Sequence, residues 1–242
     1  MEYLFIFLLF IIAALYASVG HGGASGYLAL MAIFGFGQYL MKSSALTLNL
    51  FVAGIAFYSF YKKGYFKFKV LLPFIIGSIP MAFLGARMTI NPHTYKMILG
   101  IFLLIAVSRM LFSPKGEYEK SNNPIFFVAV LIGAVVGFFS GMIGIGGGII
   151  LSPILLLMHW ANMKETAGIS ALFILVNSTA GLLGLVFNAA FTPSPQILVW
   201  AAVGLAGGFM GSFLSSVKLS SFKLKYVLVF VLVVASFKLF IY

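Results

Sequence analysis

Gly144-Ile145-Gly146-Gly147-Gly148 interrupts one long apolar stretch of this chain, and Gly20-His21-Gly22-Gly23-Ala24 interrupts another. Glycine inside a helix costs about 1 kcal/mol relative to alanine, so each cluster is expected to end a helix. Irregular backbone is tolerated at membrane depth only where protein or water surrounds it. Paired broken helices in the two halves of a chain are typical of the substrate site of a secondary transporter. The sequence therefore predicts a transporter with two broken helical hairpins.

The composition places the chain in a membrane. Of its 242 residues, 62% are hydrophobic and 8% are charged, against about 25% charged in an average soluble domain. Cysteine is absent, which excludes disulfides, and the three histidines lack the spacing of metal ligands. The net charge of +11 comes largely from lysines in short loops, where they act as topology signals. We therefore expect a lipid bilayer as partner, and no nucleic acid, cofactor or metal.

The apolar runs form two sets with the same rhythm. The first set lies at 3–19, 27–36, 45–61, 70–88 and 95–112, and the second at 125–143, 149–160, 167–187, 197–217 and 226–242. Residues 3–19 are interpreted as the first membrane helix and not as a signal peptide, because no basic residue precedes them. The prediction is an all-α polytopic membrane protein with a first repeat at 1–112, a linker at 113–124 and a second repeat at 125–242. Each repeat would hold one broken hairpin and three transmembrane helices.

The lysines predict how the repeats are oriented. One group lies between the third and fourth runs of the first half, and another between the fourth and fifth runs of the second half: Lys62, Lys63, Lys67 and Lys69, then Lys218, Lys223 and Lys225. By the positive-inside rule both loops are cytoplasmic. This requires inverted repeats with both termini outside the cytoplasm. Eight identical spans, the alternative, would put one lysine group on the wrong face.

The short helix after each cluster is expected to present unpaired N–H groups and a positive dipole end. Two such ends facing each other near the membrane midplane would bind an anion without a buried Lys or Arg. Close helix packing is the alternative reason for the glycines. The candidate substrate-binding residues are Gly20, His21, Gly22, Gly23, Ala24, Ser25, Thr47 and Asn49 in the first half, and Ser140, Gly144, Gly146, Gly147, Gly148, Ser170 and Asn177 in the second.

For two kinds of candidate residue, the sequence allows two interpretations. His21 is taken as the ionisable side chain deep within an apolar run, able to bind an anion or carry a proton, or else to be a neutral histidine at a cavity mouth. Asn49 and Asn177 either contact substrate or bond between helices. No Ser, His and carboxylate come together, so an enzyme is not expected. The scarcity of carboxylates in the apolar runs argues against a cation as substrate.

Four motifs resemble those of one known family. They are Ser18-Val19-Gly20-His21-Gly22-Gly23, Phe139-Ser140-Gly141-Met142-Ile143-Gly144-Ile145-Gly146-Gly147-Gly148, Leu151-Ser152-Pro153 and Ala167-Gly168-Ile169-Ser170. Over nearly its whole length the chain resembles the sulfite exporter TauE/SafE family of membrane permeases. That resemblance implies transport of sulfite, small organosulfonates or related organic anions across the bacterial inner membrane. The first cluster departs from the glycine-rich pattern at His21 and Ala24, which leaves the substrate open.

The sequence thus predicts a secondary transporter of a small anion such as sulfite or a short organosulfonate or carboxylate. The substrate would bind between the two hairpins, and access would alternate between the two faces of the membrane. Two alternatives stay open: an anion or small-solute channel, and a non-transporting membrane subunit of a larger complex. A second copy of the chain, forming a homodimer, is an open expectation as well.

Overall fold

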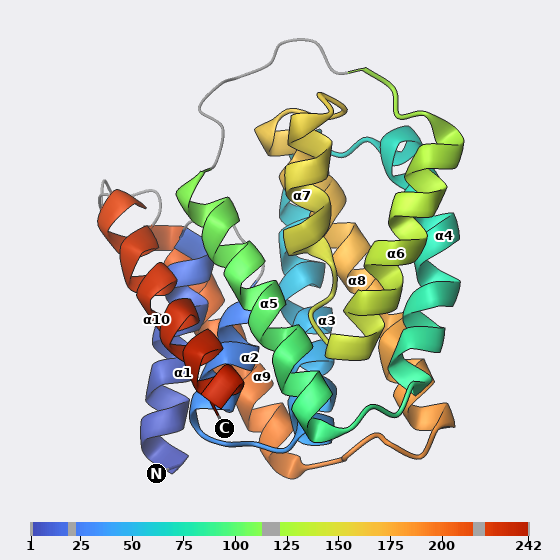
Figure 1. The fold of residues 1–242 in the computed structure, drawn as a ribbon. Coiled ribbons are helices and arrows are strands. Elements are labelled where there is room, and N and C mark those ends of the chain that lie inside the picture. The colour runs from blue at the N-terminus through green and yellow to red at the C-terminus, as the bar shows by residue number, and fades with distance from the viewer. Residues whose placement is uncertain (1, 19–22, 113–121, 215–220, 242) are drawn as a thin grey trace. The chain divides into compact units, whose positions relative to one another are not determined.

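The computed structural model describes residues 2–18, 23–112, 122–214 and 221–241 (Figure 1). These residues form helices joined by short loops, and no strand occurs among them. The helices are α1 (Glu2–Ser18), α2 (Ala24–Ile33), α3 (Gln38–Lys62), α4 (Phe68–Arg87), α5 (Pro92–Leu111), α6 (Phe126–Ile143), α7 (Gly148–Leu157), α8 (Met163–Phe187), α9 (Pro195–Leu214) and α10 (Ser221–Ile241). By length and composition, α3, α4, α5, α6 and α8 can each cross a membrane. The predicted all-α polytopic class is confirmed.

Helix lengths repeat along the chain. From α1 to α5 they are 17, 10, 25, 20 and 20 residues. From α6 to α10 they are 18, 10, 25, 20 and 21 residues. The short helix after each glycine cluster has ten residues in both sets, which agrees with the expected half-helices. Whether the sets are related by symmetry, with repeats at 1–112 and 125–242, stays a prediction.

The third apolar run, expected at 45–61, belongs to a longer helix that begins at Gln38. The first turns of α3 contain polar residues that hydropathy does not count. Gln38 donates to the Ile90 carbonyl at 3.2 Å, and the Ser43 hydroxyl accepts from the Thr192 amide at 3.1 Å. Because other segments pair these side chains, the helix extends beyond its apolar run.

The chain folds into two compact units that do not follow its two halves. Unit 1 contains 1–52, 89–112 and 192–242, and unit 2 contains 53–88 and 113–191. In unit 2, α4 from the first half packs along α6 from the second. In unit 1, α9 from the second half packs along α1 from the first. Each unit therefore combines the hairpin of one half with helices from the other half.

Glycines permit the close approach of α4 and α6 in unit 2. A methyl group on Gly77 or Gly85 would collide with the Val130 or Phe138 carbonyl of α6. Methyl groups on the α6 glycines would in turn collide with α4 backbone at Phe74, Ser78 and Ala82. Since Gly77 lies opposite Val130 and Gly85 opposite Phe138, the two helices run parallel. Small residues that let backbones touch are typical of helix contacts in membranes.

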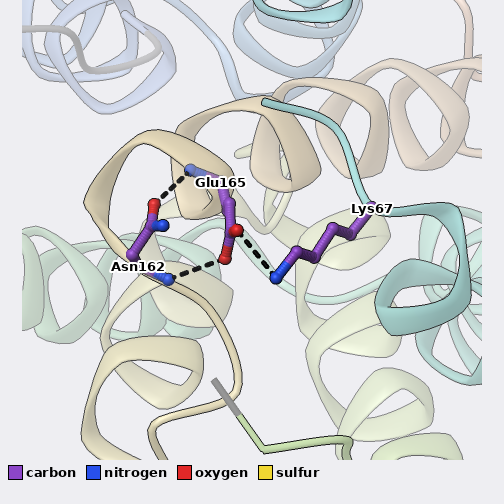
Figure 2. A network of polar contacts seen from close by, with 3 residues as sticks. All are labelled: Lys67, Asn162 and Glu165. Carbon is purple, nitrogen blue, oxygen red and sulfur yellow. Dashed lines mark hydrogen bonds and ion pairs between the residues drawn. The ribbon is translucent and has the colours of Figure 1, made fainter. Parts of the chain in front are cut away.

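One end of unit 2 is tied together by polar contacts (Figure 2). Lys67, just before α4, pairs with Glu165 in the first turn of α8 at 2.7 Å. Glu165 also accepts from the Asn162 amide, while the Asn162 side chain accepts from the Glu165 amide, which completes a capping box. The Asn122 amide, ahead of α6, donates to the His159 carbonyl after α7 at 2.8 Å. Thus α4, α6 and α8 begin at this end, and α7 returns to it.

Polar contacts also define one end of unit 1. Gln196 at the start of α9 lies 3.3 Å from the Glu2 carboxylate at the start of α1. Lys238 near the end of α10 donates to the Ile33 carbonyl at the end of α2. Hence α1 and α9 begin here, whereas α2 and α10 end here. Both chain ends approach the same end of unit 1.

Candidate functional site

The turn between α6 and α7 is built from left-handed glycines. Gly144, Gly146 and Gly147 have φ values of 90°, 80° and 78°. Residues with a Cβ avoid this region at a cost of about 1–2 kcal/mol, which explains why glycine occupies all three positions. The Gly144 and Ile145 amides both donate to the Ser140 carbonyl, which ends α6. The second cluster therefore breaks the helix as predicted.

The turn lies beside the middle of α8. A methyl group on Gly147 would lie 2.8 Å from the Phe173 ring, and one on Gly148 would contact the Ile174 side chain. Both contacts fall near the centre of the 25-residue helix α8. The ten residues of α7 span about 15 Å, roughly half the length of α8. Helix α7 thus begins near the middle of α8, whereas α6 runs along α4 as far as Gly85.

Unpaired donors gather at this turn. The amides of Gly146, Gly147, Gly148 and Ile149 pair with no acceptor in the part of the chain that is described, and all four residues are buried. The Ser140 hydroxyl is also buried without a partner, and its Cβ lies 3.3 Å from the methyl position of Gly147. Buried donors in proteins are almost always paired. This cluster of unused donors at the start of α7 is what an anion site requires.

Two further candidates of the second half lie on α8. Ser170 bonds to Ser152 of α7 at 2.8 Å, and Ser152 donates onward to the Gly148 carbonyl at 2.6 Å. Since a hydroxyl has one proton, Ser170 must donate to Ser152, so this pair holds α7 against α8. Asn177 is fully buried; its amide nitrogen donates to the Phe173 carbonyl, and its Oδ1 has no partner. Asn177 lies on the same face of α8 as Phe173, toward the turn.

In unit 1, the first cluster precedes α2 in the corresponding way. Gly23 is the N-cap of α2, as Gly147 is of α7, and its carbonyl accepts from the Tyr27 amide. The Tyr27 side chain folds back over Gly23, so a methyl group at Gly23 would collide with the Tyr27 ring and hydroxyl. Ala24 and Ser25 form the first turn, and the Ser25 hydroxyl bonds to that of Tyr16 at 2.7 Å. Gly20, His21 and Gly22 lie outside the described residues.

Thr47 and Asn49 belong to the same unit. The Thr47 hydroxyl donates to the Ser43 carbonyl of its own helix at 2.7 Å, and Asn49 is buried. Between them, Leu48 lies 3.1 Å from the methyl position of Gly204, which is also 4.0 Å from the Tyr27 hydroxyl. This turn of α3 therefore lies level with the start of α2. The described candidates collect in two places, one at the start of each short helix.

One buried cation was not among the expected site residues: Lys42 is 1% exposed. Lys42 precedes the apolar run at 45–61 and has polar neighbours, so hydropathy alone does not place it within a buried helix. The clue in the sequence was the helical spacing of Gln38, Lys42 and Leu46. Arg109 on α5 is half-buried and close enough to Tyr16 for the two to interact electrostatically. Lys42 is thus an ionisable group inside unit 1 that hydropathy did not indicate.

Comparisons with known proteins agree with this architecture. The profile of the family described as "Sulfite exporter TauE/SafE" matches residues 5–239. A "Probable membrane transporter protein y4hK" of Sinorhizobium fredii is 36% identical over 238 residues, covering 95% of this chain and 94% of the relative. A "Probable membrane transporter protein YdhB" of Bacillus subtilis is 25% identical over 225 residues, 86% of this chain and 88% of the relative. No solved structure is significantly similar to the chain.

Proposed function

This chain belongs to the sulfite exporter TauE/SafE family of multi-pass membrane transporters, and from that premise we propose that it carries a small oxyanion. The substrate class is sulfite or a short organosulfonate or carboxylate. The chain acts as a secondary transporter, binding the anion at the start of a short half-helix. That the two hairpins face each other across the substrate stays a prediction.

One observation carries this proposal: four buried amides and the Ser140 hydroxyl at the start of α7 have no partner among the described residues. A leftover donor in an apolar segment costs about 1–3 kcal/mol unless a ligand accepts from it. Oxygens of sulfite, sulfonate and carboxylate are acceptors, and the dipole of α7 favours their charge. Glu165, the carboxylate described in unit 2, forms an ion pair with Lys67 at one end of the unit. The unpaired donors at the start of α7 therefore favour an anion over a cation.

The distribution of charge in each unit supports entry of the two hairpins into the membrane from opposite sides. At the end of unit 2 where α6 begins and α7 ends lie exposed lysines: Lys62, Lys63, Lys67, Lys69 and Lys164. In unit 1, α9 runs away from the Glu2 end, and the sequence after it contains Lys218. The positive-inside rule then makes the α6–α7 hairpin enter from the cytoplasm and the α1–α2 hairpin from outside. Both termini would lie outside.

Single-cysteine labelling tests this topology, because the chain has no cysteine of its own. Asn123→Cys lies ahead of α6, and Thr89→Cys lies in the link before α5; both positions are exposed. We expect a membrane-impermeant maleimide to label Thr89→Cys in intact cells and Asn123→Cys only after the membrane is opened. Lys63→Cys serves as the cytoplasmic control. Labelling of Asn123→Cys from outside would contradict the proposed entry of the α6–α7 hairpin.

Transport by the purified protein in liposomes tests the substrate site. We expect saturable sulfite uptake that shows counterflow, with Ser140→Ala raising the half-saturating concentration about tenfold because one donor is lost. The same variant should keep or slightly gain stability, since an unpaired buried hydroxyl disappears. Ser236→Ala is the matched control, because that buried hydroxyl is already paired with the Leu232 carbonyl.

The alternatives give different results in this assay. Uptake without saturation or counterflow would indicate a channel. No flux of sulfite, organosulfonate or carboxylate by the purified chain would favour a non-transporting membrane subunit. Unchanged sulfite affinity in Ser140→Ala would remove the start of α7 from the substrate site.

A further inference from the structure

The fold buries the charged side chain of Lys42. Among the residues whose burial is described, every other Lys, Arg and Glu is at least partly exposed, and Lys42 is 1% exposed. It lies in the second turn of α3, within a helix apolar enough to cross a membrane. A lysine near a helix end normally extends its ammonium to the membrane surface. Lys42 does not, so its charge stays inside unit 1.

Two aromatic rings lie near the Lys42 ammonium, which makes no hydrogen bond or ion pair with the described residues. Its Nζ lies 5.3 Å from the centre of the buried Tyr95 ring and 6.0 Å from that of Tyr39. A ring face attracts a cation but does not replace the hydrogen bonds that an ammonium makes in water. Gln38, one turn earlier on the same face, has a buried Oε1 without a partner. The Lys42 ammonium is therefore a donor, and Gln38 Oε1 an acceptor, that makes no hydrogen bond with the described residues.

The protein offers no described counterion for this charge. Glu2 bonds to Gln196, and Glu165 pairs with Lys67 in the other unit. The remaining glutamates, Glu117 and Glu119, lie outside the described residues. A buried ammonium without a partner is strongly unfavourable. An anion from solution is the partner that the chemistry of a small-oxyanion transporter supplies.

Two other lysines of the helices have either a hydrogen-bond acceptor or exposure to solvent, and Lys42 has neither. Lys238 donates to the Ile33 carbonyl, and Lys62, on the same helix as Lys42, lies 5.1 Å from the Tyr58 ring but is exposed to solvent. Two bonds hold the Lys42 turn in place: Gln38 to Ile90, and Thr192 to Ser43. These bonds fix the turn of α3 that carries Lys42.

We propose that Lys42 is a second anion-binding residue, in unit 1, whose ammonium contacts a small oxyanion or halide between the Tyr39 and Tyr95 rings. The identity of the anion rests on the proposed function, whereas the site rests on the burial and missing counterion of Lys42. This end of unit 1 is the one that the charge distribution places outside.

Thermal unfolding of the purified protein tests this site, with sulfite and chloride as probes against a gluconate background. In gluconate, Lys42→Gln should unfold at a higher temperature than the wild type, because an unpaired buried charge is removed. Its apparent dissociation constant for sulfite should rise at least tenfold, whereas Lys42→Arg should stay within a few-fold of the wild type. Lys62→Gln is the matched control: the same helix, residue type and ring contact, but exposed. It should change neither quantity.

The outcomes separate this inference from the proposed function. If Lys42→Gln lowers the unfolding temperature and keeps the wild-type affinity, Lys42 is structural and the inference is wrong. If only Ser140→Ala weakens sulfite binding, the α7 site is supported and the Lys42 site is contradicted. If chloride but not sulfite binds in a Lys42-dependent way, the Lys42 site is supported and the proposal of an oxyanion substrate is contradicted. If neither probe stabilises the wild type, both are overturned.

Discussion

Replacing Gly141 with alanine is expected to destabilise unit 2 by about 3 kcal/mol, through overpacking of two backbones. The new methyl group would lie 2.7 Å from the Ala82 carbonyl carbon of α4 and closer still to its oxygen. Backbone atoms cannot rotate away as a side chain can, so α4 and α6 must separate. Their separation would also break the neighbouring glycine contacts along the same pair of helices.

Gly54→Ala is the control for this variant. It lies in α3 within unit 2, and the nearest atom to its methyl position is Leu175 Cδ1 at 4.0 Å. Alanine there should be neutral or slightly stabilising, since it favours helix by up to about 1 kcal/mol.

Fluorescence-detected unfolding can follow unit 2 by itself. The two tryptophans lie in different units: Trp160 beside Phe74 in unit 2, and Trp200 beside Phe5 in unit 1. A Trp200→Phe background leaves Trp160 as the reporter. Equal unfolding temperatures of Gly141→Ala and Gly54→Ala would contradict the close α4–α6 contact.

Replacing Gly147 with alanine is expected to reduce transport about 100-fold while most of the fold is kept. Its φ of 78° costs an alanine about 1–2 kcal/mol, and the methyl group would lie 2.8 Å from the Phe173 ring and 3.1 Å from Val136. The turn must shift, and with it the direction of the unpaired amides at the start of α7. Binding that depends on several aligned donors falls steeply when they turn together.

Gly64→Ala separates backbone strain from loss of the site. Gly64 has a similar φ of 74°, but nothing lies within 4 Å of its methyl position, and it belongs to the loop before α4. It should lose comparable stability and keep sulfite uptake. Wild-type uptake by Gly147→Ala would show that the geometry of this turn does not matter for transport.

Local chemistry made much of the architecture readable in advance. Three or more glycines at one place cannot continue a helix cheaply, so the break before α7 and the ten-residue helices that follow both clusters were predictable. The apolar runs likewise predicted the helices, because a membrane demands internally bonded backbone. The start of α3 was not predictable in this way, since its polar residues find partners only at Ile90 and Thr192, far along the chain.

The candidate site was predictable only in part. Ser140 and the glycines of the second cluster lie close in sequence, so one helix end brings them together. Ser170 was expected beside the substrate, yet its proton is used by Ser152, which depends on how α7 lies against α8.

By itself, the sequence determined the membrane class, the two helix breaks and the family motifs, because each depends on neighbouring residues and on the period of the helix. Only the tertiary structure decided that α4 packs on α6 and α9 on α1, and that Lys42 is buried. Those features depend on contacts between segments tens to hundreds of residues apart. The burial of a side chain is set by what packs around it, and hydropathy along the chain carries no information about that.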